Sequence, residues 1–272
     1  MVSVPVVRAS IDRDWLVRAV RREPVMHAFA AWDLVWEPER VRAFSCGPER
    51  SPTGYLLIWL GDPSHPVVHW VGDPRLTRVL AEHLPPRPIT VGGPIECIEI
   101  VEAARGPVRW SLIDRLIARP TTVVPGSGDP RVRAVGPADA GTLRAWAAHH
   151  PSPFVQGYAK FRFDPDRLFA WAAWDGRRPV GVAFASVRLP EVWTLNGIFV
   201  EESARREGIG RALTAFGMEA ARRAGAPTHL NVREENVGAR RVYDRLGFRA
   251  VDRIAWIEAT TPLPPPSGRE AA

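Results

Sequence analysis

The sequence predicts a mixed α/β protein made of two domains, and three observations lead to this prediction. The chain has 272 residues, more than a single domain of about 100–200 residues usually needs. Its composition, 46% hydrophobic and 24% charged, is typical of a globular protein with a sizeable core. Its second half follows the order helix, three strands, helix, strand, helix, strand, which predicts a sheet covered by helices.

The second half carries the clearer patterns. Apolar residues at helical spacing predict its helices, and apolar runs bounded by turn residues predict its strands. The predicted elements are a helix over 137–149, strands over 169–175, 179–187 and 192–200, a helix from residue 209 to a stop at Gly225 and Pro227, a strand over 228–232, a helix over 237–246 and a strand over 248–257. The three consecutive strands are joined by short turns and predict a meander.

The first half repeats this order more faintly. The predicted elements are helices over 11–34 with a break at Pro24, strands over 41–46, 54–60 and 66–71, a helix around 76–80, a strand over 88–91, a helix over 94–104 and a strand over 108–113. Corresponding strands lie about 125 residues apart, which we interpret as a degenerate internal duplication. A chance alignment of short patterns is the competing interpretation.

A loop-like stretch separates the two halves. Residues 123–135 combine glycine, proline, serine and aspartate between apolar runs. The end of the chain, TPLPPPSGREAA, has no apolar periodicity and predicts a flexible, proline-rich tail. We therefore predict a first domain over 1–122, a linker over 123–130, a second domain over 131–260 and a tail over 261–272.

The charge of the chain does not indicate a nucleic-acid partner. The net charge is +6, but Lys160 is the only lysine and the arginines are spread over the whole length, whereas nucleic-acid binding needs basic residues on one face. Cys46 and Cys97 belong to no disulfide or metal motif. No apolar run is long enough for a membrane span or a signal peptide, so the sequence predicts a cytoplasmic protein.

Two glycines open the helix that follows the third strand of the second half. Gly208 and Gly210 lie in VEESARREGIGRAL, residues 200–213, among several arginines. Glycines at a helix start leave the backbone N–H groups unobstructed, and the helix dipole adds positive potential. Such a junction suits a pyrophosphate, although a tight turn without a ligand is the competing interpretation.

Two motifs in the second half occur together in one known family. Arg205, Gly208 and Gly210 match the loop Arg/Gln-x-x-Gly-x-Gly/Ala, and NVGARRVYDRLGF, residues 236–248, supplies an Asn, a Tyr seven residues later and a Leu-Gly-Phe. The sequence therefore resembles the GNAT superfamily of acyl-CoA-dependent N-acyltransferases over about residues 130–258. The resemblance implies a GNAT fold, with a mixed, centrally splayed sheet flanked by helices, preceded here by a second GNAT-like α/β domain.

The resemblance also implies a binding mode for acetyl-CoA, with no metal. The pantetheine arm would lie between the strands 192–200 and 228–232. Two departures from the family pattern, Glu202 for proline and Arg206 for glycine, put the shape of the loop in doubt more than cofactor binding. The implied cofactor-binding residues are Ile198, Phe199, Val200, Arg205, Arg206, Glu207, Gly208, Ile209, Gly210, Arg211, Asn236 and Tyr243.

Three groups receive roles at the reacting centre from this resemblance. Tyr243 would protonate the departing thiolate, with a core tyrosine as the competing interpretation. Asn236 would bond the cofactor arm, and it also suits the N-cap of its helix. A backbone N–H at Phe199 or Val200 would meet the thioester oxygen.

The proton acceptor for the amine is not evident from the sequence. Many relatives carry a glutamate in the strand before the loop, but 192–200 has no carboxylate, so Asn196 or Thr194 would hold a relaying water. His149 and His150 follow the first helix, where relatives form part of the acceptor pocket, although solvation of a helix end is the plainer interpretation. Tyr243 and Asn196 are thus the catalytic candidates, and the acceptor-site candidates are His149, His150, Trp193 and Thr194. Weaker candidates are the acids Glu191, Asp164 and Asp166 and the pocket wall Trp146.

Gly197 lies inside a predicted strand of the second half. A glycine in the interior of a strand indicates a bulge or the close approach of a ligand.

The corresponding junction of the first half lacks the glycine pair. The chain passes there through Gly72, Asp73 and Pro74 into the helix without a GxG. We therefore predict that residues 1–120 bind no acyl-CoA and pack beside the active copy to help form the acceptor cleft, distantly like glycine N-acyltransferase-like or mycothiol-synthase-like tandem proteins.

These observations predict an acetyl-CoA-dependent N-acetyltransferase that modifies the primary amine of a small molecule or amino-acid derivative. The protein would be a monomer or homodimer, with no nucleic-acid or membrane partner. Two alternatives remain open: a protein or peptide N-acetyltransferase, and a non-catalytic acyl-CoA-binding sensor. Retention of Tyr243 favours catalysis, whereas the missing strand glutamate favours the sensor.

Overall fold

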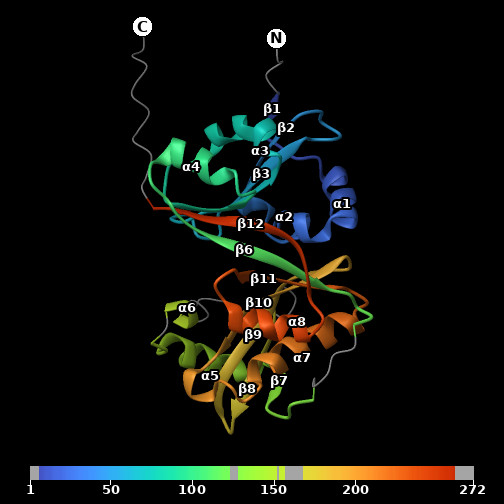
Figure 1. Cartoon of the computed structure of the whole chain (residues 1–272), viewed down its shortest axis with the longest axis vertical. Coiled ribbons are helices and arrows are strands. Elements are labelled where there is room, and N and C mark those ends of the chain that lie inside the picture. The colour runs from blue at the N-terminus through green and yellow to red at the C-terminus, as the bar shows by residue number, and fades with distance from the viewer. Residues whose placement is uncertain (1–5, 123–127, 152, 157–167, 261–272) are drawn as a thin grey trace. The chain divides into compact units, whose positions relative to one another are not determined.

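The computed structural model describes residues 6–122, 128–151, 153–156 and 168–260 (Figure 1). These residues fall into two compact units of mixed α/β structure. Within the described ranges, the first unit comprises residues 6–114 and 252–260, and the second comprises the described residues between 115 and 251. Two long strands, β6 (Arg109–Ala118) and β12 (Arg249–Ala259), contribute residues to both units.

The first unit has a sheet with the strand order β1-β2-β3-β4-β5-β12. Its other elements are β1 (Val7–Arg8), α1 (Arg13–Arg22), α2 (Pro24–Trp36), the 3₁₀ helix η1 (Pro38–Arg40), β2 (Val41–Cys46), β3 (Gly54–Trp59), β4 (Val67–Gly72), α3 (Pro74–Thr77), the 3₁₀ helix η2 (Arg78–His83), β5 (Ile89–Gly93) and α4 (Cys97–Arg105). Strands β4 and β5 are parallel and the other neighbours in this sheet are antiparallel. The helical crossover of α3 and η2 makes the parallel pair possible.

Local sequence signals explain how the first unit is built. The Asp12 side chain caps α1 by accepting the Trp15 N–H at 2.9 Å, and Pro24 occupies the first position of α2. The break predicted at Pro24 is therefore confirmed. Alternate residues of the strands, such as Leu56 and Trp70, turn to one face and form an apolar core with η2 and α4.

The second unit has a sheet with the strand order β11-β10-β9-β8-β7. Its elements besides the long strands are β7 (Val132–Ala134), α5 (Pro137–Ala148), α6 (Pro153–Gln156), β8 (Phe169–Asp175), β9 (Arg178–Leu189), β10 (Val192–Val200), the 3₁₀ helix η4 (Glu202–Ala204), α7 (Ile209–Arg223), β11 (Thr228–Arg233) and α8 (Val237–Arg245). Strands β7 to β10 are antiparallel neighbours, which confirms the predicted meander, and β10 is parallel to β11. The short elements β7 and α6 were not predicted.

Helix α7 packs closely on one face of the second sheet because two glycines let it approach. A Cβ atom on Gly217 would lie 2.5 Å from the Trp171 ring, and one on Gly181 would lie 3.1 Å from a Leu213 methyl group. The Trp171 indole N–H donates to the Leu213 carbonyl at 2.7 Å. These contacts fix the helix, and with it the loop that connects β10 to α7.

Helix α5 contributes to a separate core of the second unit. Its Leu143 and Ala147 pack with Val182 of β9, whereas the next residue of the strand, Ala183, belongs to the core that α7 covers. Successive strand residues point to opposite faces of a sheet. Strand β10 consequently presents one face toward α7 and the other toward α5.

The last strand of the chain pairs with the first unit. The sequence predicts a strand over 248–257 and assigns it to the second domain, but β12 lies antiparallel to β5, from Ala255↔Gly93 to Ala259↔Ile89. The apolar pattern of a strand specifies which residues are buried but not which strand lies beside it. The predicted domain range 131–260 therefore differs from the observed second unit, Arg115–Val251.

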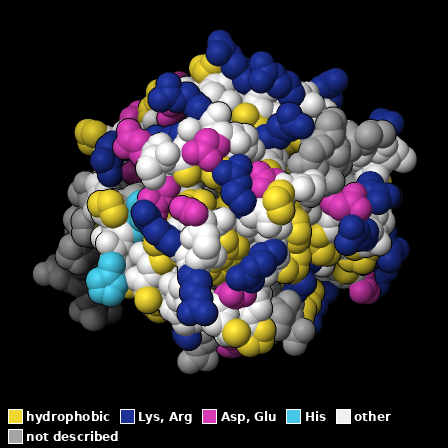
Figure 2. All heavy atoms as spheres, turned by 90° about the horizontal axis from the view of Figure 1, so that it is seen from below, with side chains coloured by type: hydrophobic (Ala, Val, Ile, Leu, Met, Phe, Trp, Pro, Cys, Tyr) yellow, Lys and Arg dark blue, Asp and Glu magenta, His cyan; other side chains and the backbone are white. Residues whose placement is uncertain are grey.

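The surface mixes charges of both signs. Figure 2 shows arginine side chains interspersed with acidic ones over the visible face. Both cysteines, Cys46 and Cys97, are free and buried in the core of the first unit. None of the helices in the described ranges combines the length and apolar character needed to cross a membrane.

Candidate functional site

Strand β10 leaves its parallel neighbour before it ends. Register pairs with β11 run from Trp193↔Thr228 to Leu195↔Leu230 and stop there within the described residues, although β10 continues to Val200. The carboxyl ends of the two strands are therefore no longer joined by a ladder of backbone hydrogen bonds. This is the location at which the sequence predicts a splayed sheet.

A bulge changes the course of β10 just beyond this point. Gly197 has a φ of +61°, and the register with β9 shifts between Asn196 and Phe199. An L-residue rarely adopts such a φ, which explains glycine in the interior of this strand. The bulge predicted at Gly197 is confirmed.

Hydrogen bonds with β9 fix the directions in which the last backbone N–H groups of β10 point. The N–H of Glu201 donates to the Val180 carbonyl at 2.9 Å, and Val200 pairs with Gly181. Residues of an antiparallel strand bond their neighbour alternately. The N–H of Val200 thus points away from β9, toward the edge from which β11 has parted, whereas the N–H of Phe199 points toward β9. Of the two predicted donors, the geometry favours Val200.

The loop between β10 and α7 contains two residues with positive φ. Arg206 has a φ of +68° and Gly208, the N-cap of α7, has a φ of +83°. Arg206 occupies the position at which the family usually has glycine, and its conformation shows why glycine suits that position. The departure noted from the sequence therefore leaves the turn intact.

The space in front of the loop is open. A Cβ atom on Gly208 would meet no atom within 4 Å, and one on Gly210 would lie 3.7 Å from Val200. The first turn of a helix has N–H groups without acceptors inside the helix, and the dipole of α7, 15 residues long, directs positive potential to the same place. Ile209 is buried, so only its backbone can face a ligand.

Charged side chains hold the loop. Arg131 donates to the Glu207 carboxylate at 2.7 Å and to Asp129 at 3.0 Å, and its hydrogen bonds lower the pKa of Asp129. The Glu207 carboxylate is thereby engaged by an arginine. Arg205 donates from Nε to the Val200 carbonyl at 3.2 Å, and Arg205, Arg206 and Arg211 are exposed. The loop therefore offers arginines to solvent while its acidic Glu207 is paired.

Helix α8 carries the second motif. The Asn236 side chain accepts the Ala239 N–H at 3.2 Å, so it is the N-cap of this helix. Tyr243 is 7% exposed and packs edge-to-face on Phe248. Burial raises the pKa of Tyr243 to about 12, so its hydroxyl keeps its proton at neutral pH.

The middle of β10 holds a buried polar pair that sequence reasoning missed. Thr194 and His229 are both fully buried, with Thr194 Oγ1 3.2 Å from His229 Nδ1. Burial, together with the charge of Arg115, lowers the pKa of His229 to about 3, so the imidazole is neutral. A histidine in an apolar strand is the only signal the sequence gives. Thr194, predicted to hold a water near the acceptor, is instead enclosed beside His229.

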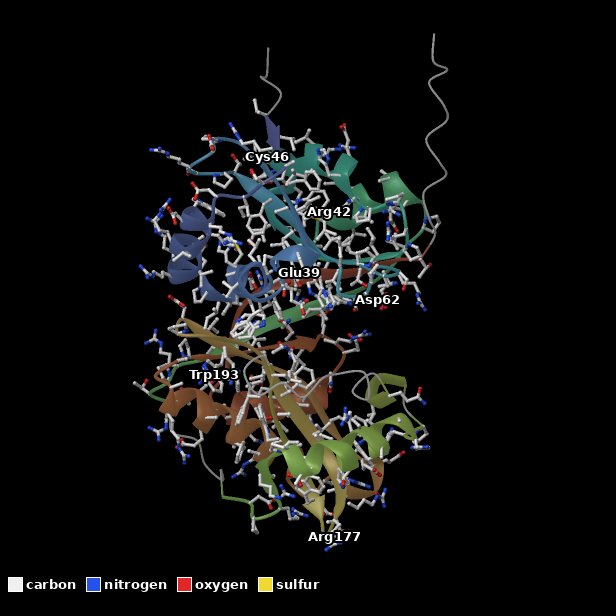
Figure 3. All side chains as sticks on the ribbon, turned by 180° about the vertical axis from the view of Figure 1, so that it is seen from behind. Glu39, Arg42, Cys46, Asp62, Arg177 and Trp193 are labelled. Atoms are coloured by element: carbon white, nitrogen blue, oxygen red, sulfur yellow. The ribbon has the colours of Figure 1, made fainter. Side chains whose placement is uncertain are left out.

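Two other strand candidates lie in different surroundings. The Asn196 side-chain amide donates to the Ser186 hydroxyl of β9. Trp193 lies at the start of β10 (Figure 3), packs against Phe169 at 6.0 Å between ring centroids and has Arg188 over its ring at 5.9 Å. Trp193 therefore belongs to the aromatic core on α7 and not to the loop end of the strand.

The structure separates the two adjacent histidines after α5. His149 is exposed and its Nδ1 donates to the Ala145 carbonyl at 2.8 Å, which is the bonding of a helix end. His150 is enclosed, with its ring edge-to-face on Trp146 at 5.2 Å and on Phe199 at 5.1 Å. His150 and the predicted pocket wall Trp146 thus meet the end of β10, whereas His149 does not.

Glu201 joins this group and was not singled out by sequence reasoning. Its carboxylate accepts the Trp146 indole N–H and an Arg178 N–H, each at 2.8 Å, and lies 4.0 Å from His150 Nε2. The partner on α5 is 55 residues away in sequence, so no local motif could indicate the contact.

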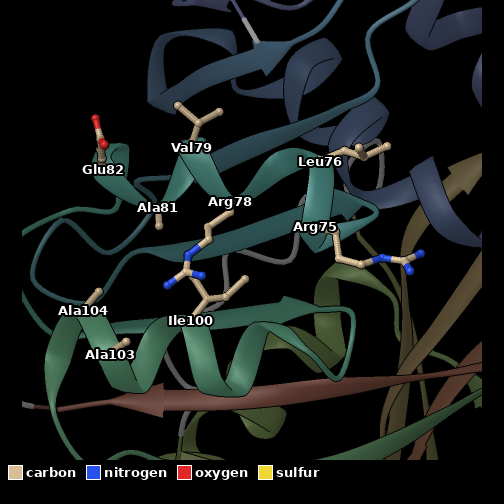
Figure 4. A pocket seen from close by; sticks show the side chains of 9 residues that line it. All are labelled: Arg75, Leu76, Arg78, Val79, Ala81, Glu82, Ile100, Ala103 and Ala104. Carbon is tan, nitrogen blue, oxygen red and sulfur yellow. The ribbon is translucent and has the colours of Figure 1, made fainter. Parts of the chain in front are cut away.

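The remaining candidates lie elsewhere. Glu191 precedes β10 at the end opposite the loop, and Asp164 and Asp166 lie outside the described residues. A groove of about 530 Å³ in the first unit lies between α3–η2 and α4 (Figure 4). Its lining residues are Arg75, Leu76, Arg78, Val79, Ala81, Glu82, Ile100, Ala103 and Ala104, none of which the sequence singles out as a site residue.

The equivalent junction of the first unit is closed by its own side chains. Asp73 caps α3 by accepting the Arg75 N–H at 2.9 Å, and it forms an ion pair with the Arg75 guanidinium at 2.6 Å. These bonds lower the pKa of Asp73. Pro74 has no N–H to offer at the first position of the helix.

Comparison with known proteins agrees with this geometry. The sequence pattern of the family described as "Acetyltransferase (GNAT) family" matches residues 140–248. Residues 140–248 therefore carry the sequence pattern of the GNAT acetyltransferase family. The chain is 36% identical over 151 residues to a mycothiol acetyltransferase from Mycolicibacterium paratuberculosis, a match that covers 46% of this chain and 48% of the relative. The chain thus spans about half the length of these curated relatives.

Solved structures extend the likeness in fold to almost the whole chain. A GCN5-related N-acetyltransferase from Sphaerobacter thermophilus has a TM-score of 0.59 at 17% identity, covering 96% of this chain and 98% of its own. A tandem GNAT protein from the clavulanic acid biosynthesis pathway has a TM-score of 0.54 at 16% identity, covering 94% and 98%. The predicted fold class, GNAT with a preceding GNAT-like domain, is confirmed.

Proposed function

We propose that the chain is an acetyl-CoA-dependent N-acetyltransferase that acts on the primary amine of a small molecule or amino-acid derivative. The observation that carries the proposal is the parting of β10 and β11 after Leu195↔Leu230, directly before a glycine loop that opens α7. A gap between strands accommodates an extended arm, and the loop accommodates a pyrophosphate. The family match over residues 140–248 supports both assignments.

The residues present fit acetyl-CoA. The open space at Gly208, the exposed Arg205, Arg206 and Arg211, and the N-terminus of α7 suit a doubly charged phosphate group. Asn236 begins α8 and would bond the arm, as predicted. No described atom lies within 4 Å of the position that a Gly208 Cβ would take, so a ligand can reach the backbone there.

The bound cofactor would supply an acyl thioester whose carbonyl carbon a neutral amine can attack. The Val200 N–H, turned away from β9, would donate to the acyl oxygen. The Tyr243 hydroxyl, which keeps its proton because its pKa is about 12, would give that proton to the departing sulfur. His150 would accept the proton that the ammonium loses.

Two observations favour a small acceptor. The relative named mycothiol acetyltransferase matches over about half its length. Its name favours a small amine over a protein as the acceptor. The enclosed aromatic surroundings of His150, between Trp146 and Phe199, also suit a small acceptor.

A thiol-release assay with acetyl-CoA and a panel of small amines, peptides and mycothiol-related amines tests the proposal. We expect turnover on at least one small amine and preference for it over peptides. Binding of acetyl-CoA without turnover on any amine would contradict the proposal and favour the acyl-CoA sensor.

A further inference from the structure

A carboxylate directly after β10 connects three elements of the second unit. Glu201 follows Val200, and its side chain is only 12% exposed. One oxygen accepts the indole N–H of Trp146 on α5 at 2.8 Å, and the other accepts an N–H of Arg178, the first residue of β9, at 2.8 Å. The start of the loop between β10 and α7 is therefore fixed to α5.

The Glu201 oxygen that accepts from Trp146, Oε1, also faces His150. His150 Nε2 lies 4.0 Å from Oε1 of Glu201, and the His150 side chain is 10% exposed. Trp146 and Phe199 contact the imidazole by ring edges, and the Gln156 amide donates to the His150 carbonyl at 2.9 Å. Aromatic rings of α5 and β10 thus hold the imidazole, and α6 holds the backbone of the same residue.

Glu201 is suited to hold its neighbours and not to accept a proton. Burial raises the pKa of the carboxyl, but the hydrogen bonds from Trp146 and Arg178 and the charges of Arg178 and His150 outweigh burial and lower it. A carboxylate that is ionised at neutral pH and bonded through both oxygens is a weak base. Its contribution is geometric.

We propose that Glu201 is a positioning residue for acyl transfer, because it holds the Val200 N–H and the His150 imidazole in one fixed arrangement. The inference rests on the proposed function, in which these two groups meet the acyl oxygen and the amine. Displacing such groups by about 1 Å can lower a rate by about 10²-fold. The bonds of Glu201 join the two groups through α5 and the end of β10.

Steady-state kinetics of the full chain test the role. We expect Glu201→Ala to lower kcat at least about ten-fold while the KM for acetyl-CoA changes less than about three-fold. Glu201→Gln keeps an oxygen for the Trp146 indole and should regain most of kcat. Glu219→Ala is the matched control and should leave kcat unchanged. Glu219 is likewise a carboxylate bonded through both oxygens, to Arg222 at 2.7 Å and Arg223 at 3.0 Å, but it lies on α7.

Two results would overturn the inference. One is a Glu201→Ala variant with lowered thermal stability and unchanged kcat, which would make the contact structural only. The other is equal loss in Glu201→Gln and Glu201→Ala, which would assign the effect to charge and not to position.

A second readout keeps the inference separate from the proposed function. If the wild type turns over no amine, the proposed function fails, and the amide resonance of Val200 is followed by NMR during titration with acetyl-CoA. We expect the shift on binding to differ in Glu201→Ala and to be restored in Glu201→Gln. An identical shift in all three proteins contradicts the positioning role.

Discussion

The junctions β4–α3 and β10–α7 occupy the same place in the topology of the two units but have opposite chemistry. In each unit three antiparallel strands lead up to the junction. The next strand after the helix is parallel to the strand that enters the junction: β5 to β4 and β11 to β10. In the second unit the helix starts at Gly208 with open space before it. In the first unit Asp73 caps the helix with its own carboxylate and Pro74 removes an N–H.

The helices after the two junctions differ as well. Helix α7 has 15 residues, whereas α3 has 4 residues and passes into the 3₁₀ helix η2. A short helix has a weak dipole, and an acidic cap already uses the positive end. The same topology thus places a glycine-capped helix start in one unit and an acid-capped helix start in the other. Under the proposed function only the glycine-capped start suits an anion, and Asp73, Pro74 and Gly208 make the difference.

The largest difference between the units should appear when the hydroxyl of a buried tyrosine is removed. Tyr243→Phe should lower kcat by about 10²-fold or more, because the acid for the departing sulfur is lost, with little change in the KM for acetyl-CoA. Thiol-release kinetics measure both constants. In the first unit the Tyr55 hydroxyl is bonded to His27 Nδ1 at 2.9 Å, so Tyr55→Phe should cost about 1–3 kcal/mol of stability and leave kcat intact. Unchanged turnover in Tyr243→Phe would remove Tyr243 from the mechanism.

Arginines beside the two junctions give the next contrast. Arg205→Ala should weaken acetyl-CoA binding by about 1.5–3 kcal/mol, because a charge-assisted phosphate contact is lost. Arg75→Ala in the first unit should not change the affinity, since Arg75 is paired with Asp73. Calorimetric dissociation constants for both variants decide the matter, and equal effects would mean that the junctions do not differ in the way described.

Strand β11, parallel to β10, and strand β5, parallel to β4, should contribute differently to the loss of stability in acid. The pKa of His229 in the folded chain, about 3, lies below the value of about 6.5 expected in the unfolded chain, so the unfolded state binds more protons between these values. Stability should therefore fall as the pH falls below about 6.5, by about 2 kcal/mol at pH 5 from this residue. Strand β5, ITVGG, has no titratable side chain.

Urea unfolding at pH 7 and pH 5 measures this effect. His229→Gln removes the imidazole and should show a smaller loss of stability between the two pH values than the wild type. A loss that is the same in both proteins would show that His229 is not the group responsible.

The smallest effect concerns backbone strain in the loop. A positive φ costs a non-glycine residue about 1–2 kcal/mol, and glycine gives back about 0.5–1 kcal/mol through the entropy of the unfolded chain. Arg206→Gly should therefore stabilise the chain by about 0.5 kcal/mol, measured by thermal unfolding. The opposite change at the first junction, Gly72→Ala, should destabilise it, because a Cβ there would lie 2.7 Å from the Thr53 carbonyl. Destabilisation by Arg206→Gly would contradict the strain argument.

Much of the second unit could be predicted because its signals are local. Apolar spacing, with stops at glycine and proline, placed α7 and α8 to within a few residues, and Gly197 marked the bulge in β10. The glycine loop and Tyr243 carried a family pattern that the match to residues 140–248 supports. These features depend on residues close together in the chain.

The features that escaped prediction depend on contacts between distant residues. The pairing of β12 with β5 joins segments more than 150 residues apart, and an apolar strand pattern names no partner. The burial of Thr194 beside His229 and the bonds of Glu201 to Trp146 arise only once the strands and α5 pack together. Sequence reasoning accordingly found the loop but not the network that holds it.

The number of acetyl-CoA molecules bound per chain tests the contrast between the two junctions most directly. Isothermal titration of the full chain should give one site, and substitution of Gly208 by valine should abolish or weaken that site at least about ten-fold, because a side chain would fill the open space at the loop. Two sites per chain, or one site unaffected by Gly208→Val, would contradict the account.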